Sequence, residues 1–262
     1  MSKFRWLNQE TLNQLPFSLP WKIEVVEQTG STNADLAARV RAGGCPDYTV
    51  LVTTDQCGGR GRLARTWTAP ADTAVAMSMA VPLKPFEGHW GLLPLVMGSA
   101  VAGALFDWGV KAKLKWPNDV YIGDKKVCGI LGEFVGGTAV IGCGINVAQT
   151  QETIGYETAT SLAMTGVHVT HDEVVSRVLD HFGRALDVMT TEDGPALLRD
   201  FYRASSMTLG QQVRIYHDED SYVEGLAIDI SDDGQLLIDI DGEVQSFASG
   251  DVYHLRSQDR GD

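Results

Sequence analysis

Residues 57–67 read Cys-Gly-Gly-Arg-Gly-Arg-Leu-Ala-Arg-Thr-Trp and combine three arginines with three glycines. Glycine lets backbone N–H groups approach a ligand closely, and arginine offers a planar fork of donors that matches carboxylate or phosphate. The whole chain has a formal net charge of −13, so this concentration of cations stands out within it. An isolated Gly/Arg run is most often a solvated surface loop. The motifs that accompany this one favour a site for a small anion instead.

Further segments along the chain carry groups of the same kind. Gly30-Ser31-Thr32-Asn33 precedes the Gly/Arg loop, and Lys115-Trp116-Pro117-Asn118-Asp119 follows it. A glycine-containing segment at 126–133 begins with a lysine, and residues 142–147 read Gly-Cys-Gly-Ile-Asn-Val. Each motif alone is weak support for a site, because glycine and lysine also mark ordinary turns. Their order along the chain is far more specific.

Taken in this order, the motifs resemble the biotin protein ligase family, and the resemblance runs from about Ser31 to Arg256. It implies a reaction in which the biotin carboxylate attacks the α-phosphate of ATP, giving biotinyl-5′-AMP and pyrophosphate. A lysine of a biotin carboxyl carrier domain, part of a biotin-dependent carboxylase, then takes the biotinyl group. Biotin and ATP are the implied substrates, with Mg²⁺ as cofactor. The first step brings two anions together, so its catalysis rests on charge neutralisation and positioning.

The resemblance assigns roles by position in the motifs. The residues expected to act in catalysis are Lys126, Arg62 and Asp119. The residues expected to bind biotin are Ser31, Thr32, Asn33, Gln56, Arg60, Gly61, Arg62 and Lys126. The residues expected to bind the nucleotide are Arg62, Arg65, Trp67, Lys115, Asn118 and Asn146.

Some of these roles have alternatives in the residues themselves. Lys126 is expected to contact both the biotin carboxylate and the α-phosphate, although a lysine beside a hairpin is ordinarily solvated. Asp119 is expected to orient either Lys126 or a hydrated Mg²⁺. The alternative is that its carboxylate only forms hydrogen bonds within its own loop. No other residue is assigned as a metal ligand. Trp67 is expected to shelter the adenine ring, where a tryptophan of the core is the alternative. Ser31 or Thr32 can cap a helix and still contact a ligand.

Periodicity and turn signals predict the elements that position these motifs. The helices are expected to begin at Thr32, within the apolar run 88–106, at Thr170 and at about Ala196. The run 88–106 reads as a buried helix rather than a membrane span. Strands are predicted at 23–26, 48–53, 74–81, 113–116, 120–122, 126–135 and 138–147.

Short connections such as Gly123-Asp124 and Gly136-Gly137 force neighbouring strands to pair antiparallel. The fold class is therefore α+β, with a mixed, mostly antiparallel sheet flanked by helices. The resemblance implies the catalytic fold of biotin and lipoate ligases, which is related to class II aminoacyl-tRNA synthetases. Residues 1–20 read as short and irregular.

The texture of the chain changes after Ser205. Short strands at 211–216, 223–230, 235–240, 244–247 and 252–255 alternate with turns, which predicts a small β-barrel. The resemblance makes this barrel SH3-like. The predicted domains are a biotin- and ATP-binding catalytic domain, 1–205, and a small C-terminal barrel, 206–262.

Charge and composition narrow the class of protein. The net charge of −13 argues against a broad nucleic-acid or anionic-membrane footprint, since both require a positive field. The four cysteines form no C-x-x-C pair and the N-terminus shows no signal peptide, so a cytoplasmic protein is expected. The matched region begins near Ser31, which favours a monofunctional ligase without an N-terminal DNA-binding domain. A lipoyl or other acyl-protein ligase and a biotin-responsive transcriptional regulator remain as alternatives.

Three further features bear on the site. Ala64 occupies a place in the Gly/Arg loop where the family usually has glycine, which costs about 1 kcal/mol if φ is positive there. Cys57 and Cys128 flank ligand-binding segments, so their modification is hypothesised to block adenylation, with ordinary packing as the alternative. His168, His171 and His181 are interpreted as surface or capping residues.

Overall fold

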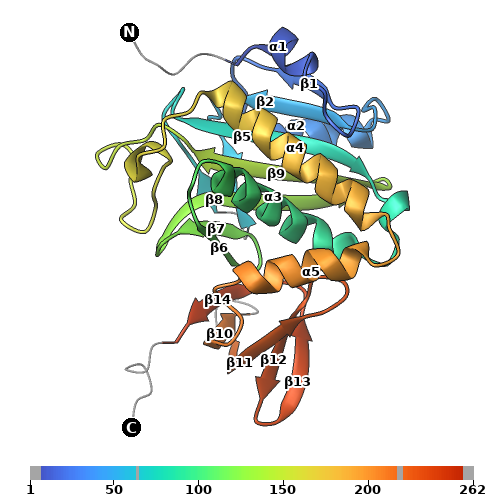
Figure 1. Ribbon diagram of the computed structural model, residues 1–262, viewed down its shortest axis with the longest axis vertical. Helices are drawn as coiled ribbons and strands as arrows, with labels where there is room; N and C mark the ends of the chain where they lie inside the picture. The colour runs from blue at the N-terminus through green and yellow to red at the C-terminus, as the bar shows by residue number, and fades with distance from the viewer. Residues whose placement is uncertain (1–6, 63–64, 217–220, 256–262) are drawn as a thin grey trace.

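The computed structural model describes residues 7–62, 65–216 and 221–255. Within these residues a seven-stranded sheet has the order β1-β2-β5-β9-β8-β7-β6 (Figure 1). Its first pair, β1 with β2, is parallel, and every other neighbouring pair is antiparallel. This confirms the predicted mixed, mostly antiparallel sheet. The strands are β1 (Lys22–Val25), β2 (Thr49–Thr53), β5 (Ala74–Pro82), β6 (Ala112–Lys115), β7 (Asp119–Ile122), β8 (Lys125–Val135) and β9 (Thr138–Asn146).

Helices cover both faces of this sheet. On one face α3 (Leu93–Asp107) packs against β6, β8 and β9, and α4 (His171–Met189) packs against α3 (Figure 1). On the other face α2 (Thr32–Arg41) contacts β5, β8 and β9. The sides of β5 divide accordingly: Val75, Met77, Met79 and Val81 join the large core with α3, while Ala80 packs on α2.

The apolar run predicted as a buried helix is buried. Among the described residues, Trp90–Asp107 is the one helical segment with the length and composition of a membrane span, and 67% of it is buried. Leu93, Met97 and Val101 are at most 1% exposed. Pro94 lies in the first turn, where a missing N–H breaks no helical hydrogen bond. This helix therefore forms the core of the protein.

The predicted N-termini of two helices agree with the structure, at the same residue for α4 and to within one residue for α2. Thr170 caps α4 as expected: its Oγ1 accepts from the Glu173 N–H at 3.2 Å, and the Thr170 N–H donates to Glu173 Oε2 at 2.6 Å. At α2 the cap is Ser31, one residue before the expected position, and its Oγ accepts from the Ala34 N–H at 3.3 Å. Thr32 is therefore the first helical residue, with its side chain free for other contacts.

One expectation about a single segment is wrong. Residues 1–20, expected to be irregular, contain a short helix, α1 (Gln9–Asn13). Asn13 ties this helix to β1, because its side chain donates to Ile23 O at 2.8 Å and accepts from the Ile23 N–H at 2.9 Å. His171, interpreted as a surface or capping residue, is the first residue of α4, beside the Thr170 cap, and its side chain is 1% exposed.

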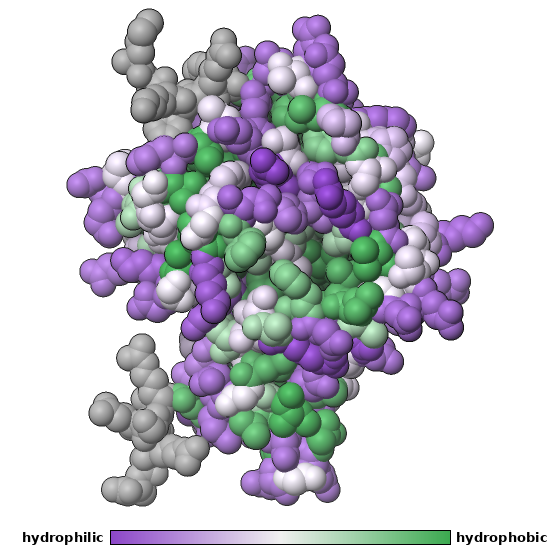
Figure 2. Space-filling view, viewed as in Figure 1, coloured by the Kyte–Doolittle hydropathy of each residue, from purple (hydrophilic) through white to green (hydrophobic). Residues whose placement is uncertain are grey.

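The C-terminal part is a five-stranded antiparallel sheet in the order β13-β12-β11-β10-β14. The helix α5 (Gly194–Ser205) lies between it and the large sheet (Figure 1). Hydrophobic side chains gather around α5 and these strands on the face shown in Figure 2. The strands are β10 (Gln212–Tyr216), β11 (Tyr222–Ile230), β12 (Leu236–Ile240), β13 (Glu243–Phe247) and β14 (Asp251–His254).

The turn between β11 and β12 docks the small sheet onto the larger part. The Gly91 N–H donates to Asp233 Oδ1 at 2.8 Å, and the buried indole of Trp116 donates to Gly234 O at 3.0 Å. Arg203 of α5 pairs with Asp229 at 2.5 Å. These contacts fix the position of β14 relative to the large sheet.

Candidate active site

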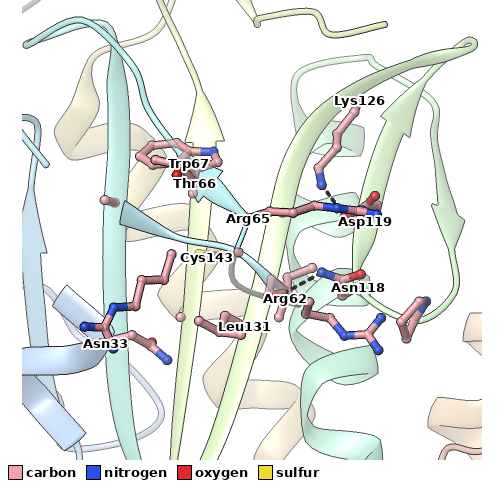
Figure 3. A pocket seen from close by; sticks show the side chains of 18 of the residues that line it. Asn33, Arg62, Arg65, Thr66, Trp67, Asn118, Asp119, Lys126, Leu131 and Cys143 are labelled. Carbon is pink, nitrogen blue, oxygen red and sulfur yellow. Dashed lines mark hydrogen bonds and ion pairs between the residues drawn. The ribbon is translucent and has the colours of Figure 1, made fainter. Parts of the chain in front are cut away.

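A cavity of about 480 Å³ lies over strands β5, β9 and β8, beside the N-terminus of α2. Side chains from α2, from the Gly/Arg loop and from the β7–β8 hairpin converge on it (Figure 3). The structure thus brings together segments that are far apart in the sequence. The cavity is lined by all the site residues expected from sequence except Asn146: Ser31, Thr32, Asn33, Gln56, Arg60, Gly61, Arg62, Arg65, Trp67, Lys115, Asn118, Asp119 and Lys126.

The floor of the cavity is made of small residues in register across two strands. Ser78 of β5 pairs with Gly142 of β9, and Ala76 pairs with Gly144. A Cβ added to Gly142 would lie 2.2 Å from Asn33 Oδ1, and one added to Gly144 would lie 2.6 Å from Trp67 Cε2. These glycines therefore make room for the side chains that line the cavity.

We expect Gly142→Ala and Gly144→Ala to damage different ends of the cavity. The first displaces Asn33, which the resemblance assigns to biotin, and should raise the KM for biotin, whereas the second displaces Trp67, which it assigns to the nucleotide, and should raise the KM for ATP. Overpacking costs about 1–3 kcal/mol, so each KM should rise roughly tenfold. Steady-state kinetics with each substrate varied measures this. Gly44→Ala is the control, because a Cβ there meets nothing within 4 Å; equal effects of both variants on both substrates would contradict the prediction.

One end of the cavity is neutral and polar. Gln56 Oε1 accepts from the Thr32 N–H at 2.9 Å, and Thr32 Oγ1 lies 2.8 Å from Ser78 Oγ. Ser78 Oγ donates to Asn33 Oδ1 at 2.8 Å. The side chains of Thr32, Ser78 and Asn33, which form these hydrogen bonds, are at most 4% exposed. Sequence reasoning missed Ser78, although a serine on the small-residue side of an otherwise apolar strand was a usable signal.

The other end is cationic. Lys126 forms an ion pair with Asp119, and Figure 3 shows the two side chains pointing at each other. Burial lowers the pKa of Lys115 and that of Arg62, because desolvation disfavours the charged form. Charges in such a partly buried site interact more strongly than in water. An anionic ligand bound here would stabilise the charged forms of Lys115 and Arg62, which burial disfavours.

The backbone around these cations is tied down. Lys126 donates its N–H to Thr158 O at 2.9 Å and accepts from the Thr160 N–H at 2.8 Å. Asn118 holds β8 through its side chain, which donates to Ile130 O at 2.9 Å. The Trp116–Pro117 peptide bond between β6 and β7 is cis. The two backbone hydrogen bonds of Lys126 place the lysine on a hairpin that is held to residues 158–160.

The described residues of the Gly/Arg loop include two short paired strands and contribute to the lining of the cavity. Strand β3 (Gly59–Arg60) pairs with β4 (Thr66–Trp67). Ala64 lies outside the described residues, so its effect on the loop stays a prediction. The loop contacts the C-terminal sheet, because Arg65 forms an ion pair with Asp251 and Arg62 Nη1 donates to Gly250 O at 3.2 Å.

The C-terminal sheet contributes a wall of the cavity that sequence reasoning did not anticipate. Asp251, Val252 and Tyr253 of β14 line it together with the residues described above. No motif marks this segment, and the predicted barrel gives no reason to place one of its edge strands beside the Gly/Arg loop. Only the docking of the two parts of the chain reveals the contact.

Two groups of predicted residues lie outside the cavity lining. Asn146 donates to Thr160 O at 2.9 Å and accepts from Gln149 Nε2 at 3.1 Å, which ties it to the loop after β9. Cys57 is exposed at the edge of the Gly/Arg loop. Cys128 is buried, and burial raises the pKa of its thiol. Burial keeps Cys128 from reagents in the folded protein and leaves Cys57 as the accessible thiol of the two.

Two family models match the chain. The biotin/lipoate A/B protein ligase family matches residues 25–147, and the biotin protein ligase C-terminal domain matches residues 208–255.

Individual proteins match over nearly the whole chain. A biotin–[acetyl-CoA-carboxylase] ligase of Mycobacterium tuberculosis is 38% identical over 90% of both chains. The bifunctional ligase/repressor BirA of Escherichia coli is 26% identical over 96% of this chain and 78% of its own length. A biotin protein ligase from Aquifex aeolicus, solved with biotin and ATP, superposes with a TM-score of 0.74 at 28% identity, covering 90% of this chain and 99% of that one. With this similarity in sequence and fold, the chain belongs to the biotin protein ligase family.

Proposed function

We propose that this protein is an ATP-dependent biotin protein ligase, which activates biotin as biotinyl-5′-AMP and transfers the biotinyl group to a lysine of a carrier domain. The observation that carries this proposal is the composition of one cavity, which joins a neutral polar end to a cationic end. Biotin has the same division, with a neutral ureido head and an anionic carboxylate. The cationic end must also accept the phosphates of ATP.

At the polar end, the hydrogen bonds suit a ureido group. Ser31 Oγ already accepts from a helix N–H, so its hydrogen is able to donate to a ureido oxygen. Gln56 Oε1 accepts from the Thr32 N–H, which leaves the Gln56 amide NH₂ as a donor. Lipoic acid, whose dithiolane ring makes no such bonds, would leave these groups unpaired at a cost of about 1–3 kcal/mol each. The polar end therefore favours biotin over lipoate.

At the cationic end, Lys126, Arg62 and Lys115 reduce the repulsion between the biotin carboxylate and the α-phosphate. A carboxylate oxygen forms a bond to the α-phosphorus as the bond to pyrophosphate breaks. In the second step the neutral amine of the carrier lysine attacks the acyl carbon, AMP leaves, and the amine loses a proton. Asp119 keeps the ammonium group of Lys126 aimed into the cavity. Arg65, Trp67 and Asn118 are proposed to hold the nucleotide.

Mg²⁺ belongs to the proposal as the partner of ATP. In nucleotide sites this cation usually takes phosphate oxygens and waters with few protein ligands. No group of three or more His, Cys, Asp or Glu residues in the described part of the chain could hold a metal ion. Asp119 and Asp251 are the carboxylates that line the cavity, and Asp119 is suited to contact a hydrated Mg²⁺ through water.

The protein partner we propose is the biotin carboxyl carrier domain of a biotin-dependent carboxylase, and the location is the cytoplasm. The M. tuberculosis relative is named as a ligase acting on acetyl-CoA carboxylase, which supports a carrier of this class. We also propose the division into a catalytic domain, 1–205, and a C-terminal barrel, 206–262, supported by the end of α5 at Ser205.

The function is tested by incubating the purified protein with ATP, Mg²⁺ and either biotin or lipoate while following pyrophosphate release. We expect release with biotin and none above background with lipoate. Addition of a carrier domain should then produce biotinylated carrier and AMP, and a carrier whose target lysine is arginine is the control. Pyrophosphate release with lipoate but not with biotin would replace this proposal with a lipoyl-ligase function.

A further inference from the structure

A chain of hydrogen bonds leads from the polar end of the cavity to a carboxylate outside it. Thr32 of α2 contacts Ser78 of β5, Ser78 contacts Asn33, and Asn33 Nδ2 donates to Glu133 Oε1 at 3.0 Å. Figure 3 shows Asn33 at the edge of the cavity. Glu133, on β8, is not among the residues that line the cavity. We call these residues the Glu133 relay.

The direction of every hydrogen bond in the relay follows from its outer end. A carboxylate only accepts, so Asn33 must present its NH₂ group to Glu133 and its Oδ1 to Ser78. That oxygen also only accepts, so the single hydrogen of Ser78 points at Asn33. Ser78 can then only accept from Thr32, so the hydroxyl hydrogen of Thr32 points to Ser78 Oγ at 2.8 Å, with Gln56 Oε1 at 3.3 Å as its other acceptor. Thr32 Oγ1 therefore offers a ligand lone pairs and no hydrogen.

We infer that Glu133 is a positioning residue, which fixes the hydrogen-bond direction along Asn33 and Ser78 so that Thr32 Oγ1 accepts a ureido N–H. This inference rests on the proposed function. A ureido group carries one carbonyl oxygen and two N–H donors, so its binding site needs both donors and acceptors. The donors come from Ser31 and Gln56, and the relay supplies one acceptor, Thr32 Oγ1.

The surroundings of the relay make its direction depend on Glu133. Ser78 is 0% exposed and Asn33 is 4% exposed, so water cannot substitute freely for a lost partner. Gly142 opposite Ser78 leaves space for the amide of Asn33, because a Cβ there would lie 2.2 Å from Asn33 Oδ1. Without the carboxylate, the amide can rotate by half a turn and present its NH₂ to Ser78. Ser78 would then donate to Thr32 Oγ1 and occupy a lone pair that otherwise accepts the ureido N–H, while the Thr32 hydrogen would turn to Gln56 Oε1.

Glu133 also lies near Arg41, so the effect of this ion pair must be distinguished from the effect of the relay. Arg41 Nη2 lies 3.7 Å from Glu133 Oε2, and the Arg41 side chain is 57% exposed. An ion pair of this exposure contributes little. Arg41→Ala is therefore a matched control: it removes the charge partner of Glu133 and leaves every hydrogen bond of the relay in place.

The test compares Glu133→Ala, Glu133→Gln and Arg41→Ala in the full chain. Glu133→Ala should raise the biotin Kd, measured by calorimetry without ATP, and the biotin KM about tenfold, while the KM for ATP and kcat stay unchanged. Glu133→Gln should bind biotin within about threefold of the wild type, because its Oε1 still accepts from Asn33. Arg41→Ala should match the wild type. A Glu133→Ala variant that binds biotin like the wild type would overturn the inference.

A second measurement tests the inference even if the Glu133→Ala protein is poorly stable. In a Ser78→Ala background the relay is already cut, so adding Glu133→Gln or Glu133→Ala should not change biotin affinity further. Additive effects of the two substitutions would show that Glu133 acts by another route and would overturn the inference. The proposed function fails separately: wild-type protein that releases no pyrophosphate with biotin contradicts the ligase itself, whereas normal release with an insensitive Glu133→Ala contradicts only the relay.

Discussion

Replacing Lys126 with alanine should reduce the rate of adenylation by about 10²–10³-fold. The ammonium group lies at the cationic end of the cavity, paired with Asp119, where a biotin carboxylate and an α-phosphate are proposed to meet. Removing it leaves two anions to approach each other with one cation fewer. Its side chain is 36% exposed, so the substitution creates no buried cavity and the fold should persist. Single-turnover pyrophosphate release measures the rate, and thermal unfolding checks the fold.

Lys125→Ala is the matched control for this prediction. Lys125 is the adjacent residue of β8 and is not among those that line the cavity. It removes the same charge from the same hairpin, so it should adenylate at nearly the wild-type rate. Near-normal turnover in Lys126→Ala, or an equal loss in both variants, would remove Lys126 from the mechanism.

Replacing Arg62 with glycine should release biotinyl-5′-AMP into solution. Arg62 lines the cavity in a half-buried position, and its guanidinium also donates to Gly250 O of the C-terminal part at 3.2 Å. The substitution removes a cation expected to hold the phosphate and a contact that ties the Gly/Arg loop to the rest of the wall. Adenylate that escapes before transfer acylates exposed lysines of any protein, because its mixed anhydride is reactive. A streptavidin blot of added serum albumin measures this bystander labelling.

The double variant Arg62→Gly with Lys126→Ala is the control, since it should make little adenylate and therefore label nothing. Free biotinyl-AMP should be detected by chromatography in Arg62→Gly and not in the wild type. An Arg62→Gly protein that labels only the carrier domain and binds the adenylate as tightly as the wild type would show that Arg62 does not retain it.

Features that depend on neighbouring residues were predictable from sequence. The capping box at Thr170 and Glu173 is a pattern of spacing within one helical turn, and it is present as expected. The hairpin turns at 123–124 and 136–137 connect antiparallel pairs, and the apolar run 88–106 supplies the core helix. Lys126 and Arg62, predicted from motifs, share one cavity. For the helices and hairpins, the chemistry that decides the structure lies within a few residues, whereas the meeting of Arg62 and Lys126 was expected from the family resemblance of their motifs.

Features that depend on distant parts of the chain were not predictable in the same way. The parallel pairing of β1 with β2 is decided by where α2 carries the chain, not by the strand sequences. Ser78 belongs to the site because its hydroxyl forms hydrogen bonds with Asn33 and Thr32 of α2. A serine in a strand gives no sign in the sequence of which residues it will contact. Asp251 reaches the cavity only because the small sheet docks beside the Gly/Arg loop. Tertiary contacts of this kind leave no local pattern.

The wall that β14 contributes to the cavity has a thermodynamic consequence for the whole chain. Because Asp251, Val252 and Tyr253 line the same space as Lys126 and Arg62, an adenylate bound in this cavity would be in contact with both parts of the molecule. Its binding free energy therefore stabilises the docked arrangement over any state in which the C-terminal sheet has separated, by RT ln(1 + [L]/Kd). Binding of the adenylate and docking of the C-terminal sheet are therefore thermodynamically linked, so each one favours the other. A mutation that loosens the docking contacts far from the cavity weakens adenylate retention as well.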